Sequence, residues 1–265
     1  MRVITCNVNG IRSACAKGLT EWLRRQNPDF VCFQEVRAAP EQMPRRASHP
    51  RGFYAHYFVP NRKGYSGVGI WSRRSPDRVE RGLGVSEWDA EARVLRADFG
   101  HLTVASLYVP SGSSGEVRQQ AKFRFMDDLL SWLKTLMNQG RQVLIAGDWN
   151  IAHKPIDLRN WRSNQKNSGF LPEERAYLDR VFDEVGYVDV FRRLNPHPDQ
   201  YTWWSNRGRA WENNVGWRLD YQIATPNLAS VAASTSVYTR KRFSDHAPLT
   251  VDYRDSELAL LPEHC

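Results

Sequence analysis

The sequence has few cysteines and no long apolar run. Its 265 residues include 4 cysteines, with no CxxC pair and no Cys/His spacing that suits a zinc site. A disulfide framework and a structural zinc ion are therefore not expected, and a reducing compartment is favoured. No apolar stretch approaches the roughly 20 residues of a membrane span, and MRVITCNVNG (1–10) lacks the apolar core of a secretory signal. Together these absences predict a cytoplasmic protein.

Acidic residues are outnumbered by basic ones. Asp and Glu total 29 against 37 Lys and Arg, which gives a formal net charge of +8 and a sequence pI near 9.5. The excess is mostly arginine, which binds phosphate through paired hydrogen bonds, so it favours a polyanionic partner. A soluble enzyme that is merely basic is the alternative. With 41% hydrophobic residues, the composition is that of an ordinary globular protein.

Short runs rich in Val, Ile and Phe, bounded by turn residues, predict β-strands. They cover residues 2–8, 30–34, 55–59, 68–72, 102–109, 143–147, 219–224 and 248–253. Apolar residues at helical spacing predict three helices. The first begins at Leu19 and stops before Pro28. The second begins at Met126 and ends near Gly140, and the third begins at Pro172 and ends at Gly186. Strands and helices interspersed along the whole chain indicate one α/β or α+β domain.

Polar side chains interrupt or follow several of these strands. Buried strands avoid carboxylates unless the carboxylates are paired or bind a metal. The ends of neighbouring strands meet at one edge of a sheet, which is the usual place for a site in α/β folds. We therefore expect one site from the residues at these ends. They are Asn7, Glu35, Tyr108, Asp148, Asn150, Asp220, Asp245 and His246.

The side chains in this set are carboxylates, amides, a phenol and an imidazole. Such an oxygen-rich site suits Mg²⁺ or Mn²⁺ better than zinc, and a hard cation of this kind polarises a phosphoryl oxygen. The set therefore favours metal-assisted phosphoester hydrolysis over acyl transfer, because no Ser or Cys lies in a nucleophile elbow. Taken singly, GDWN could be a turn, His246 a structural histidine and Asp220 a partner of Arg218. Their joint occurrence favours the site.

The motifs around these residues occur in a recognisable order. They are NVNGIR (7–12), QEVR (34–37), SLYVP (106–110), GDWNIA (147–152), NQKNSGFLPEER (164–175), GWRLDYQIA (216–224) and FSDHAPL (243–249). In this order they resemble the exonuclease III family of apurinic/apyrimidinic (AP) endonucleases, in the endonuclease/exonuclease/phosphatase superfamily. The resemblance covers residues 1–254 as one domain and leaves 255–265 as a C-terminal tail, in which ELALL could form a short helix. It implies an α/β fold, a four-layer α-β-β-α sandwich of two mixed sheets flanked by helices.

The resemblance also implies roles for the residues at the strand ends. The implied metal ligands, for Mg²⁺ with Mn²⁺ as a substitute, are Glu35, Asn7 and Asp245. The implied catalytic residues, which activate the water or contact the phosphate, are Asp148, Asn150, His246, Asp220 and Tyr108. Whether Asp148 or His246 takes the proton of the water stays open, as does the number of metal ions.

A pocket for the damaged nucleotide is implied as well. The implied substrate-binding residues are Trp203, Trp217, Leu219, Asn164, Asn167, Gly169 and Arg12. The two tryptophans and the leucine match the apolar wall of a pocket for a flipped-out abasic deoxyribose, and Trp203 stands where several relatives carry Phe. An abasic nucleotide has no base to unstack, so its extrusion costs less than the few kcal/mol of a normal base. A narrow pocket would then exclude intact nucleotides by shape.

By this resemblance the protein is a divalent-metal-dependent DNA-repair phosphodiesterase. It would cut double-stranded DNA 5′ to abasic sites, remove 3′ blocking groups as a phosphatase, phosphodiesterase or 3′→5′ exonuclease, and act as a monomer near a bacterial-type nucleoid. Three alternatives stay open: an enzyme that mainly processes 3′ ends, a phosphatase of lipid or inositol phosphates, and a non-catalytic DNA-binding module. The small Gly169 leaves room for an abasic sugar and favours incision.

Overall fold

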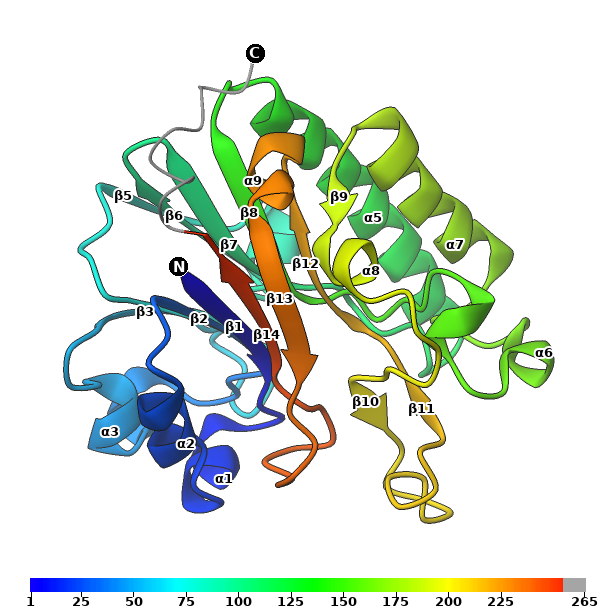
Figure 1. Cartoon of the computed structure of the whole chain (residues 1–265), viewed down its shortest axis with the longest axis horizontal. Coiled ribbons are helices and arrows are strands. Elements are labelled where there is room, and N and C mark those ends of the chain that lie inside the picture. The colour runs from blue at the N-terminus through cyan, green and yellow to red at the C-terminus, as the bar shows by residue number, and fades with distance from the viewer. Residues whose placement is uncertain (255–265) are drawn as a thin grey trace.

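The first of two β-sheets is built from both ends of the chain (Figure 1). The computed structural model describes residues 1–254. The first sheet has six strands, which in spatial order are β13 (Ala232–Val237), β14 (Leu249–Tyr253), β1 (Arg2–Asn7), β2 (Phe30–Gln34), β4 (Val68–Ser72) and β3 (Tyr54–Phe58). β1 pairs parallel with β2 and antiparallel with β14. The sheet is therefore mixed, and β1 and β2 end at the same edge.

The second sheet is formed by the middle of the chain. Its strands in spatial order are β5 (Arg78–Arg81), β6 (Val94–Phe99), β7 (Leu102–Tyr108), β8 (Gln142–Asp148), β12 (Asp220–Ala224) and β9 (Val188–Asp189). β7 runs parallel to β8 and β12 antiparallel to it, so Tyr108 and Asp220 both lie opposite Asp148. A separate two-stranded ribbon, β10 (Trp203–Trp204) and β11 (Gly216–Trp217), lies near the lower end of the molecule in Figure 1.

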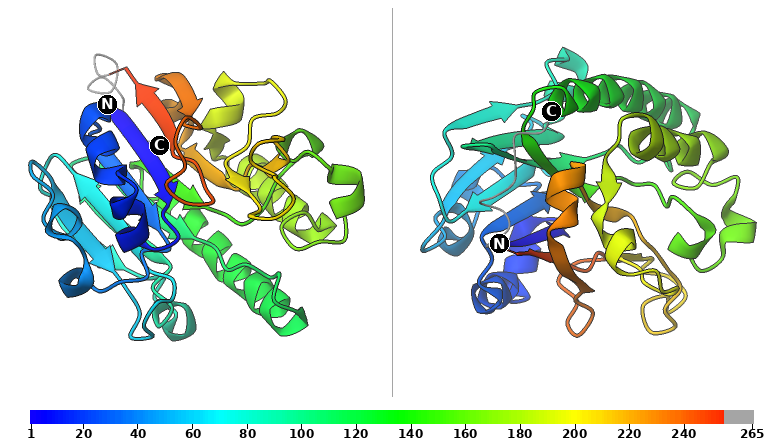
Figure 2. Two further views of the ribbon diagram at one scale, coloured as in Figure 1. Left: turned by 90° about the horizontal axis from the view of Figure 1, so that it is seen from below. Right: turned by 45° about the horizontal axis from the view of Figure 1, so that its top comes forward.

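The two sheets pack face to face, and helices cover their outer faces (Figures 1 and 2). Between the sheets, Cys32 and Ile70 belong to the same buried cluster as Leu95, Val104 and Leu144. Residues of α1 (Ile11–Ala16) and α2 (Leu19–Gln26) pack on the first sheet, and residues of α5 (Glu116–Met137) and α7 (Pro172–Asp179) pack on the second. The predicted four-layer α-β-β-α sandwich is confirmed.

The remaining helices are short and lie in the connections between the larger elements. They are η1 (Pro40–Gln42), α3 (Arg45–Ser48), α4 (Ser86–Asp89), η2 (Pro155–Asp157), α6 (Trp161–Asn164), η3 (Arg180–Glu184), α8 (Val190–Leu194) and α9 (Pro226–Ser230). Two of them, η2 and α6, belong to the segment that follows β8 and leads toward the ribbon. This segment carries several of the residues predicted to bind substrate.

Each predicted strand occurs, and its bounds differ from the prediction by no more than one residue at either end. β6 was not predicted, because Arg96 and Asp98 interrupt its apolar run. In the structure these two side chains neutralise each other, with Arg96 Nε and Nη2 lying 3.0 and 2.9 Å from the oxygens of Asp98. The pairing lets a charged sequence form a buried strand.

The predicted helices also occur, with two differences. α5 begins at Glu116, well before Met126, because its first turns carry polar residues and no readable apolar stripe. It ends at Met137, Asn138 is its C-cap, and Gly140 follows with a φ of 68°. The third helix changes from α7 into the π-helical η3, so it is not continuous α-helix as far as Gly186.

Three of the cysteines are buried and free of disulfide bonds, as predicted. Cys6 and Cys32 lie in strands and Cys15 in α1. Burial raises the pKa of the Cys15 thiol to about 11, so these side chains pack as small apolar groups. The fourth cysteine and the segment ELALL lie outside the described residues.

None of the helices within residues 1–254 combines the length and the apolar character that crossing a bilayer requires.

Arg218 is a fully buried cation that binds aspartates from two other segments of the chain. Its Nε and Nη2 lie 2.8 and 3.1 Å from the oxygens of Asp157, and Nη2 also lies 2.7 Å from Asp189. The structure therefore excludes Asp220 as the partner of Arg218. Burial alone would raise the pKa of Asp157, but the Arg218 guanidinium outweighs it and lowers that pKa to about 2.

This pairing makes a prediction about acid stability. The unfolded pKa of an aspartate is about 3.9, so the folded pKa of Asp157 is depressed. Its contribution to stability is therefore present above pH 4 and is lost as the pH falls through about 2. We expect Asp157→Asn to lower the free energy of unfolding at pH 7 by about 3 kcal/mol, because it leaves Arg218 underpaired. Urea unfolding at pH 7 and pH 3 measures both effects, and Asp183→Asn on the surface is the control. An unchanged acid response in Asp157→Asn would contradict the assignment.

Candidate active site

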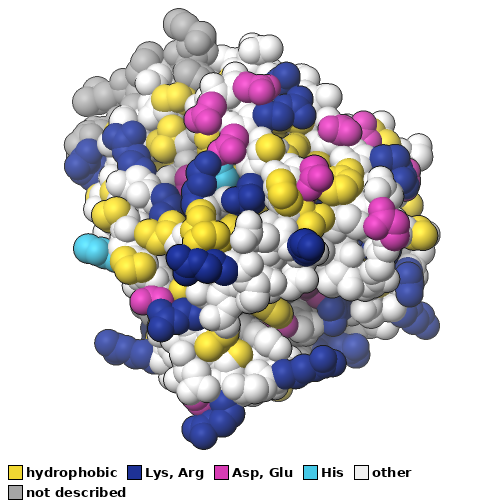
Figure 3. All heavy atoms as spheres, turned by 90° about the vertical axis from the view of Figure 1, so that its right-hand side faces the viewer, with side chains coloured by type: hydrophobic (Ala, Val, Ile, Leu, Met, Phe, Trp, Pro, Cys, Tyr) yellow, Lys and Arg dark blue, Asp and Glu magenta, His cyan; other side chains and the backbone are white. Residues whose placement is uncertain are grey.

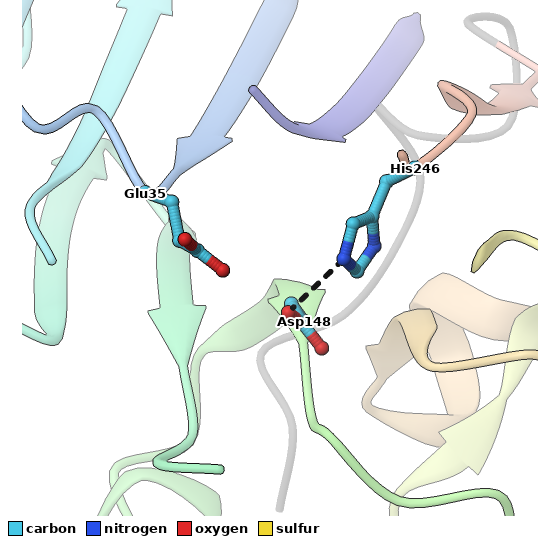
Figure 4. A group of neighbouring side chains, drawn as sticks. All are labelled: Glu35, Asp148 and His246. Atoms are coloured by element: carbon cyan, nitrogen blue, oxygen red, sulfur yellow. Dashed lines mark ion pairs between the residues drawn. The ribbon is translucent and has the colours of Figure 1, made fainter. Parts of the chain in front are cut away.

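The polar strand ends meet at one edge of the two sheets (Figure 4). Glu35 directly follows β2, Asp148 ends β8, and His246 lies just before β14. One ligand atom from each of the three lies within 4.8 Å of the others, and all three side chains are buried. Because the residues come from both sheets, the packing of the sheets assembles the site.

Asn7, the last residue of β1, links the sheets at this edge. Its amide nitrogen donates to Glu35 Oε1 at 2.9 Å and to Asp148 Oδ2 at 2.8 Å. Its Oδ1 accepts from the backbone N–H of Asn9 at 3.0 Å. Two carboxylates in a buried setting repel each other, and the fully buried Asn7 amide holds both by hydrogen bonds.

His246 lies between two carboxylates. Its Nδ1 is 2.8 Å from Asp220 Oδ2, and its Nε2 is 3.8 Å from Asp148 Oδ2. Burial alone would lower the pKa of His246, but the attraction of Asp220 and Asp148 outweighs it and raises that pKa to about 10. The imidazole is therefore protonated at neutral pH, and Asp220 fixes the orientation of its ring.

Asp148 is buried at the centre of the group. Burial raises its pKa to about 7, against the opposing attraction of His246. The backbone N–H of Asn150 donates to Asp148 Oδ1 at 2.9 Å, and the Asn150 side-chain amide donates to the Val109 carbonyl at 2.8 Å. Asn150 has a φ of 51°, a turn conformation that brings its N–H back toward Asp148. A carboxyl group with a pKa near neutrality can exchange a proton with water.

Tyr108 and Arg37 lie beside Glu35. The guanidinium of Arg37 forms an ion pair with Glu35 Oε2. Burial raises the pKa of the Tyr108 phenol well above its usual value, and the nearby Glu35 carboxylate raises it further. Tyr108 therefore stays a neutral hydrogen-bond donor at the working pH.

Asp245 binds two neutral donors. Its Oδ1 accepts from the amide of Asn9 at 2.7 Å, and its Oδ2 accepts from the indole N–H of Trp203 at 3.2 Å. Burial alone would raise the pKa of Asp245, but His246 and these donors lower it. Asp245 is thus an ionised group at the rim of the same pocket as Glu35.

A cavity of about 350 Å³ opens over this group. Most of its lining is polar, and Trp203, Trp217 and Leu219, which belong to one apolar cluster, form an apolar wall. The two indole rings meet edge to face, with centroids 6.4 Å apart. Gly169 closes the wall with a φ of 94°, and a Cβ there would lie 3.3 Å from the ring of Trp217. These residues therefore line one cavity with three of the predicted catalytic residues, Tyr108, Asn150 and His246, whereas Asp148 and Asp220 are not part of its lining.

Two predicted substrate-binding residues lie outside the cavity lining. Arg12 is exposed on α1. Asn164 ends α6, where its Oδ1 accepts from the amide of Asn167 at 2.7 Å, and Asn167 does line the cavity. In Figure 3, Lys and Arg make up most of the charged side chains on the lower half of the face, whereas acidic side chains gather higher up. The lower end is the one at which the strand ends meet in Figure 1.

Residues 4–246 match the Endonuclease/Exonuclease/phosphatase family. The chain belongs to this family. Two family relatives are each 34% identical to it. They are a DNA-(apurinic or apyrimidinic site) endonuclease of Dictyostelium discoideum, over 95% of this chain and 70% of the relative, and an exodeoxyribonuclease of Bacillus subtilis, over 94% and 98%. The solved structure of an AP endonuclease from Archaeoglobus fulgidus superposes with a TM-score of 0.87 at 30% identity, covering 96% of this chain and 99% of that one.

Enzymes of this nuclease family depend on a metal ion, and the residues present fit one. Glu35 and Asp148 bring carboxylate oxygens to one point, and none of the described residues that line the cavity is a cysteine. Oxygen donors of this kind suit a hard divalent cation. The predicted ligands Asn7 and Asp245 lie in the same region, and their side chains form hydrogen bonds with other protein groups.

Arg37 was not among the predicted site residues, although it lies in the QEVR motif that contributes to the family resemblance. Neither were Ser111, Ser113 and Ser168, which line the cavity. Arg37, Ser111 and Ser113 lie in the segments that follow strands, and Ser168 lies in the turn after α6. In such segments the composition does not show which way a side chain points. The position of Arg37 two residues after Glu35 is the one signal in the sequence that could have suggested its contact.

Proposed function

We propose that this chain is a divalent-metal-dependent DNA-repair phosphodiesterase. It hydrolyses the DNA backbone on the 5′ side of abasic sites and removes blocking groups from 3′ ends. The observation that carries the proposal is the buried group of Glu35, Asp148 and His246, which opens into a cavity with an apolar wall. The names of the two relatives, an AP-site endonuclease and an exodeoxyribonuclease, support the two halves of the proposal.

Mg²⁺, or Mn²⁺ in its place, would be held by Glu35, with Asn7 and Asp245 as the other expected ligands, and Asp148 beside it would stay free to act on the water. When bound, such an ion polarises a phosphoryl oxygen and neutralises the charge that develops on it. Asn7 already holds the two carboxylates close to each other. Its role is to keep the Glu35 and Asp148 carboxylates together against their mutual repulsion.

We assign the acceptance of the water proton to Asp148 rather than His246. His246 already carries a proton at neutral pH, since its pKa is raised to about 10. The pKa of Asp148 is about 7, which suits a general base. The His246 imidazolium would face the phosphate and, with the Tyr108 hydroxyl, stabilise its negative charge. Asn150 keeps Asp148 in place through its backbone N–H.

The apolar wall would take the deoxyribose of the lesion. Trp203, Trp217 and Leu219 offer flat, rigid surface but no donor or acceptor pattern that reads a base. Selection would then rest on the size of the group that enters. Arg12, Asn164 and Asn167 would contact the DNA backbone around the lesion.

The decisive test is a duplex oligonucleotide that carries one abasic analogue. The expected result is a nick on its 5′ side that requires Mg²⁺ or Mn²⁺ and leaves a 3′-hydroxyl. A duplex with a nick that bears a 3′-phosphate measures the second activity. If the 3′-phosphate is removed and the abasic duplex stays intact, the enzyme is mainly a 3′-end-processing one. If only a phosphoinositide is hydrolysed, the DNA-repair proposal is wrong.

Gly169 supplies a prediction about the pocket. A Cβ on this residue would lie 3.1 Å from the Asn150 carbonyl oxygen and 3.3 Å from Trp217, at a φ of 94° that L-residues rarely adopt. We expect Gly169→Ala to lower kcat/KM for abasic incision about tenfold, the kinetic equivalent of about 1.4 kcal/mol of strain. Gly208→Ala is the matched control, because Gly208 also has a positive φ of 63° but nothing within 4 Å. Equal kcat/KM values for the two variants would show that the lack of a side chain at Gly169 does not matter for the substrate pocket.

We also propose that residues 1–254 act as one domain, as a monomer on double-stranded DNA near the nucleoid. The two sheets support this, because each draws strands from distant parts of the chain and the site needs both. Light scattering after size exclusion, with and without a duplex, measures the number of chains per complex. A stable dimer in the absence of DNA would refute the monomer.

A further inference from the structure

Lys122 of α5 and Glu174 of α7 form a buried ion pair beside the pocket. Both side chains are fully buried, and Lys122 Nζ lies 2.5 Å from Glu174 Oε1. Neither residue lines the cavity. Two buried charges are costly to desolvate unless further hydrogen bonds satisfy them. The contacts of their remaining polar atoms therefore show what the pair holds.

Those contacts are to the backbone of two segments that line the pocket. Lys122 Nζ donates to the carbonyl oxygen of Asn150 at 2.8 Å. Glu174 Oε2 accepts from the backbone N–H groups of Gly169 and Leu171, at 2.6 and 3.0 Å. One ion pair thus fixes the turn after β8 and the loop that closes the apolar wall.

A third pocket segment packs on the same group. Gln119, one turn before Lys122 on α5, donates to Glu174 Oε1 at 3.1 Å. A Cβ added to Gly112 would lie 1.9 Å from Gln119 Oε1 and 2.6 Å from Ser168 Oγ, so the backbone there lies directly on the network. Ser111 and Ser113, on either side of Gly112, line the cavity.

The segments held in this way have backbone conformations that need support. Asn150 and Gly169 both have positive φ values, 51° and 94°. The two turns are also joined directly, because the Ala152 N–H donates to the Gly169 carbonyl at 2.8 Å. Positive φ at a non-glycine residue persists only where the surroundings determine it.

We propose that Lys122 and Glu174 are positioning residues for the hydrolytic reaction. The pair holds Asn150, and through it Asp148, in the reactive geometry, and it holds the Gly169 loop against Trp217. It therefore sets both the rate of the chemical step and the preference for an abasic over an intact nucleotide. The kinetic part of this proposal rests on the proposed function.

The kinetic test uses Lys122→Met, Glu174→Gln and the double variant. The double variant leaves no unpaired buried charge, so it recovers most of the thermal stability lost in Lys122→Met. Its kcat on the abasic duplex stays about tenfold to a hundredfold below wild type, because a small displacement of reacting groups is enough for such a loss. Its activity ratio between abasic and intact 3′-terminal nucleotides also falls. A double variant with wild-type kcat and ratio would overturn the proposal.

The matched control is Arg96→Met with Asp98→Asn, which removes another largely buried ion pair, on β6. This double variant is expected to keep the wild-type kcat and activity ratio per folded molecule. An equal loss of kcat in the control would show that the effect is general destabilisation, and it would count against the proposal.

A second measurement needs no enzymatic activity. The N–H groups of Gly169 and Leu171 donate to Glu174, so amide hydrogen exchange reports the contact directly. Glu174→Gln is expected to speed exchange at residues 167–171 at least tenfold, with exchange in β7 and β8 unchanged. If the wild type fails to nick DNA, the proposed function fails while this measurement still tests the pair. Unchanged exchange at 167–171 would refute the positioning role.

Discussion

Replacing Asp148 with asparagine is expected to lower kcat on an abasic duplex by about 10³-fold. Asparagine keeps the shape of the side chain and can accept from the Asn150 N–H, but it cannot take a proton from water. It also removes one of the two carboxylates that converge with His246. The affinity for the duplex should stay within twofold of the wild-type value, because Asp148 is buried beneath the cavity rather than on its surface.

Single-turnover kinetics and fluorescence anisotropy separate these two effects. Asp183→Asn, on the exposed side of η3, makes the same chemical change away from the cavity and should leave both quantities unchanged. A wild-type kcat in Asp148→Asn would show that another group accepts the proton. A joint loss of kcat and affinity would show that Asp148 also shapes the DNA-binding surface.

The fold was predictable to the extent that strands were visibly apolar. Runs such as FVCFQ and VGIWS become β2 and β4 without a change of bounds. β6 is different, because Arg96 and Asp98 stabilise it through each other after the strand has formed. A contact of this kind is tertiary, and hydrophobic periodicity does not report it.

The start of α5 shows the same limit. Its first turns contain Gln119 and Lys122, which read as surface residues in the sequence, and both are buried in the structure. They can be buried because Glu174, 52 residues after Lys122, forms an ion pair with Lys122 and accepts a hydrogen bond from Gln119. The change from α7 into η3 is likewise not visible in the sequence, because the apolar residues there keep the spacing of an α-helix.

Most of the residues that form the candidate site could be predicted from the sequence, but the partners that their side chains bind could not. A carboxylate at the end of a buried strand is a strong signal, since burial without a partner is unfavourable. The sequence does not show which partner each one has. Asp245, for example, binds Asn9 and Trp203, and Asp220 binds His246 rather than the adjacent Arg218. These choices depend on how the two sheets are packed, which local sequence does not encode.

Asp220 connects this packing to the chemistry. It begins β12 opposite Asp148, and its carboxylate holds His246 Nδ1 at 2.8 Å. We expect Asp220→Asn to lower kcat by about 10³-fold, because the imidazole loses the group that orients it and stabilises its protonated form. The pH profile should change as well. Against the effect of burial, Asp220 and Asp148 together raise the pKa of His246 to about 10. Without Asp220 this pKa falls, and the alkaline limb of kcat moves to lower pH.

A matched control for this variant exists in the same chain. His153 Nε2 lies 2.7 Å from Asp179 Oδ1, a second histidine–aspartate contact that lies away from the cavity. Asp179→Asn removes the same kind of carboxylate and should leave kcat and its pH profile unchanged. If Asp220→Asn loses rate at every pH by the same factor, with its alkaline limb in place, Asp220 orients the ring but does not sustain its charge. If the rate is retained, the imidazolium does not act on the phosphate, and the role assigned to His246 is wrong.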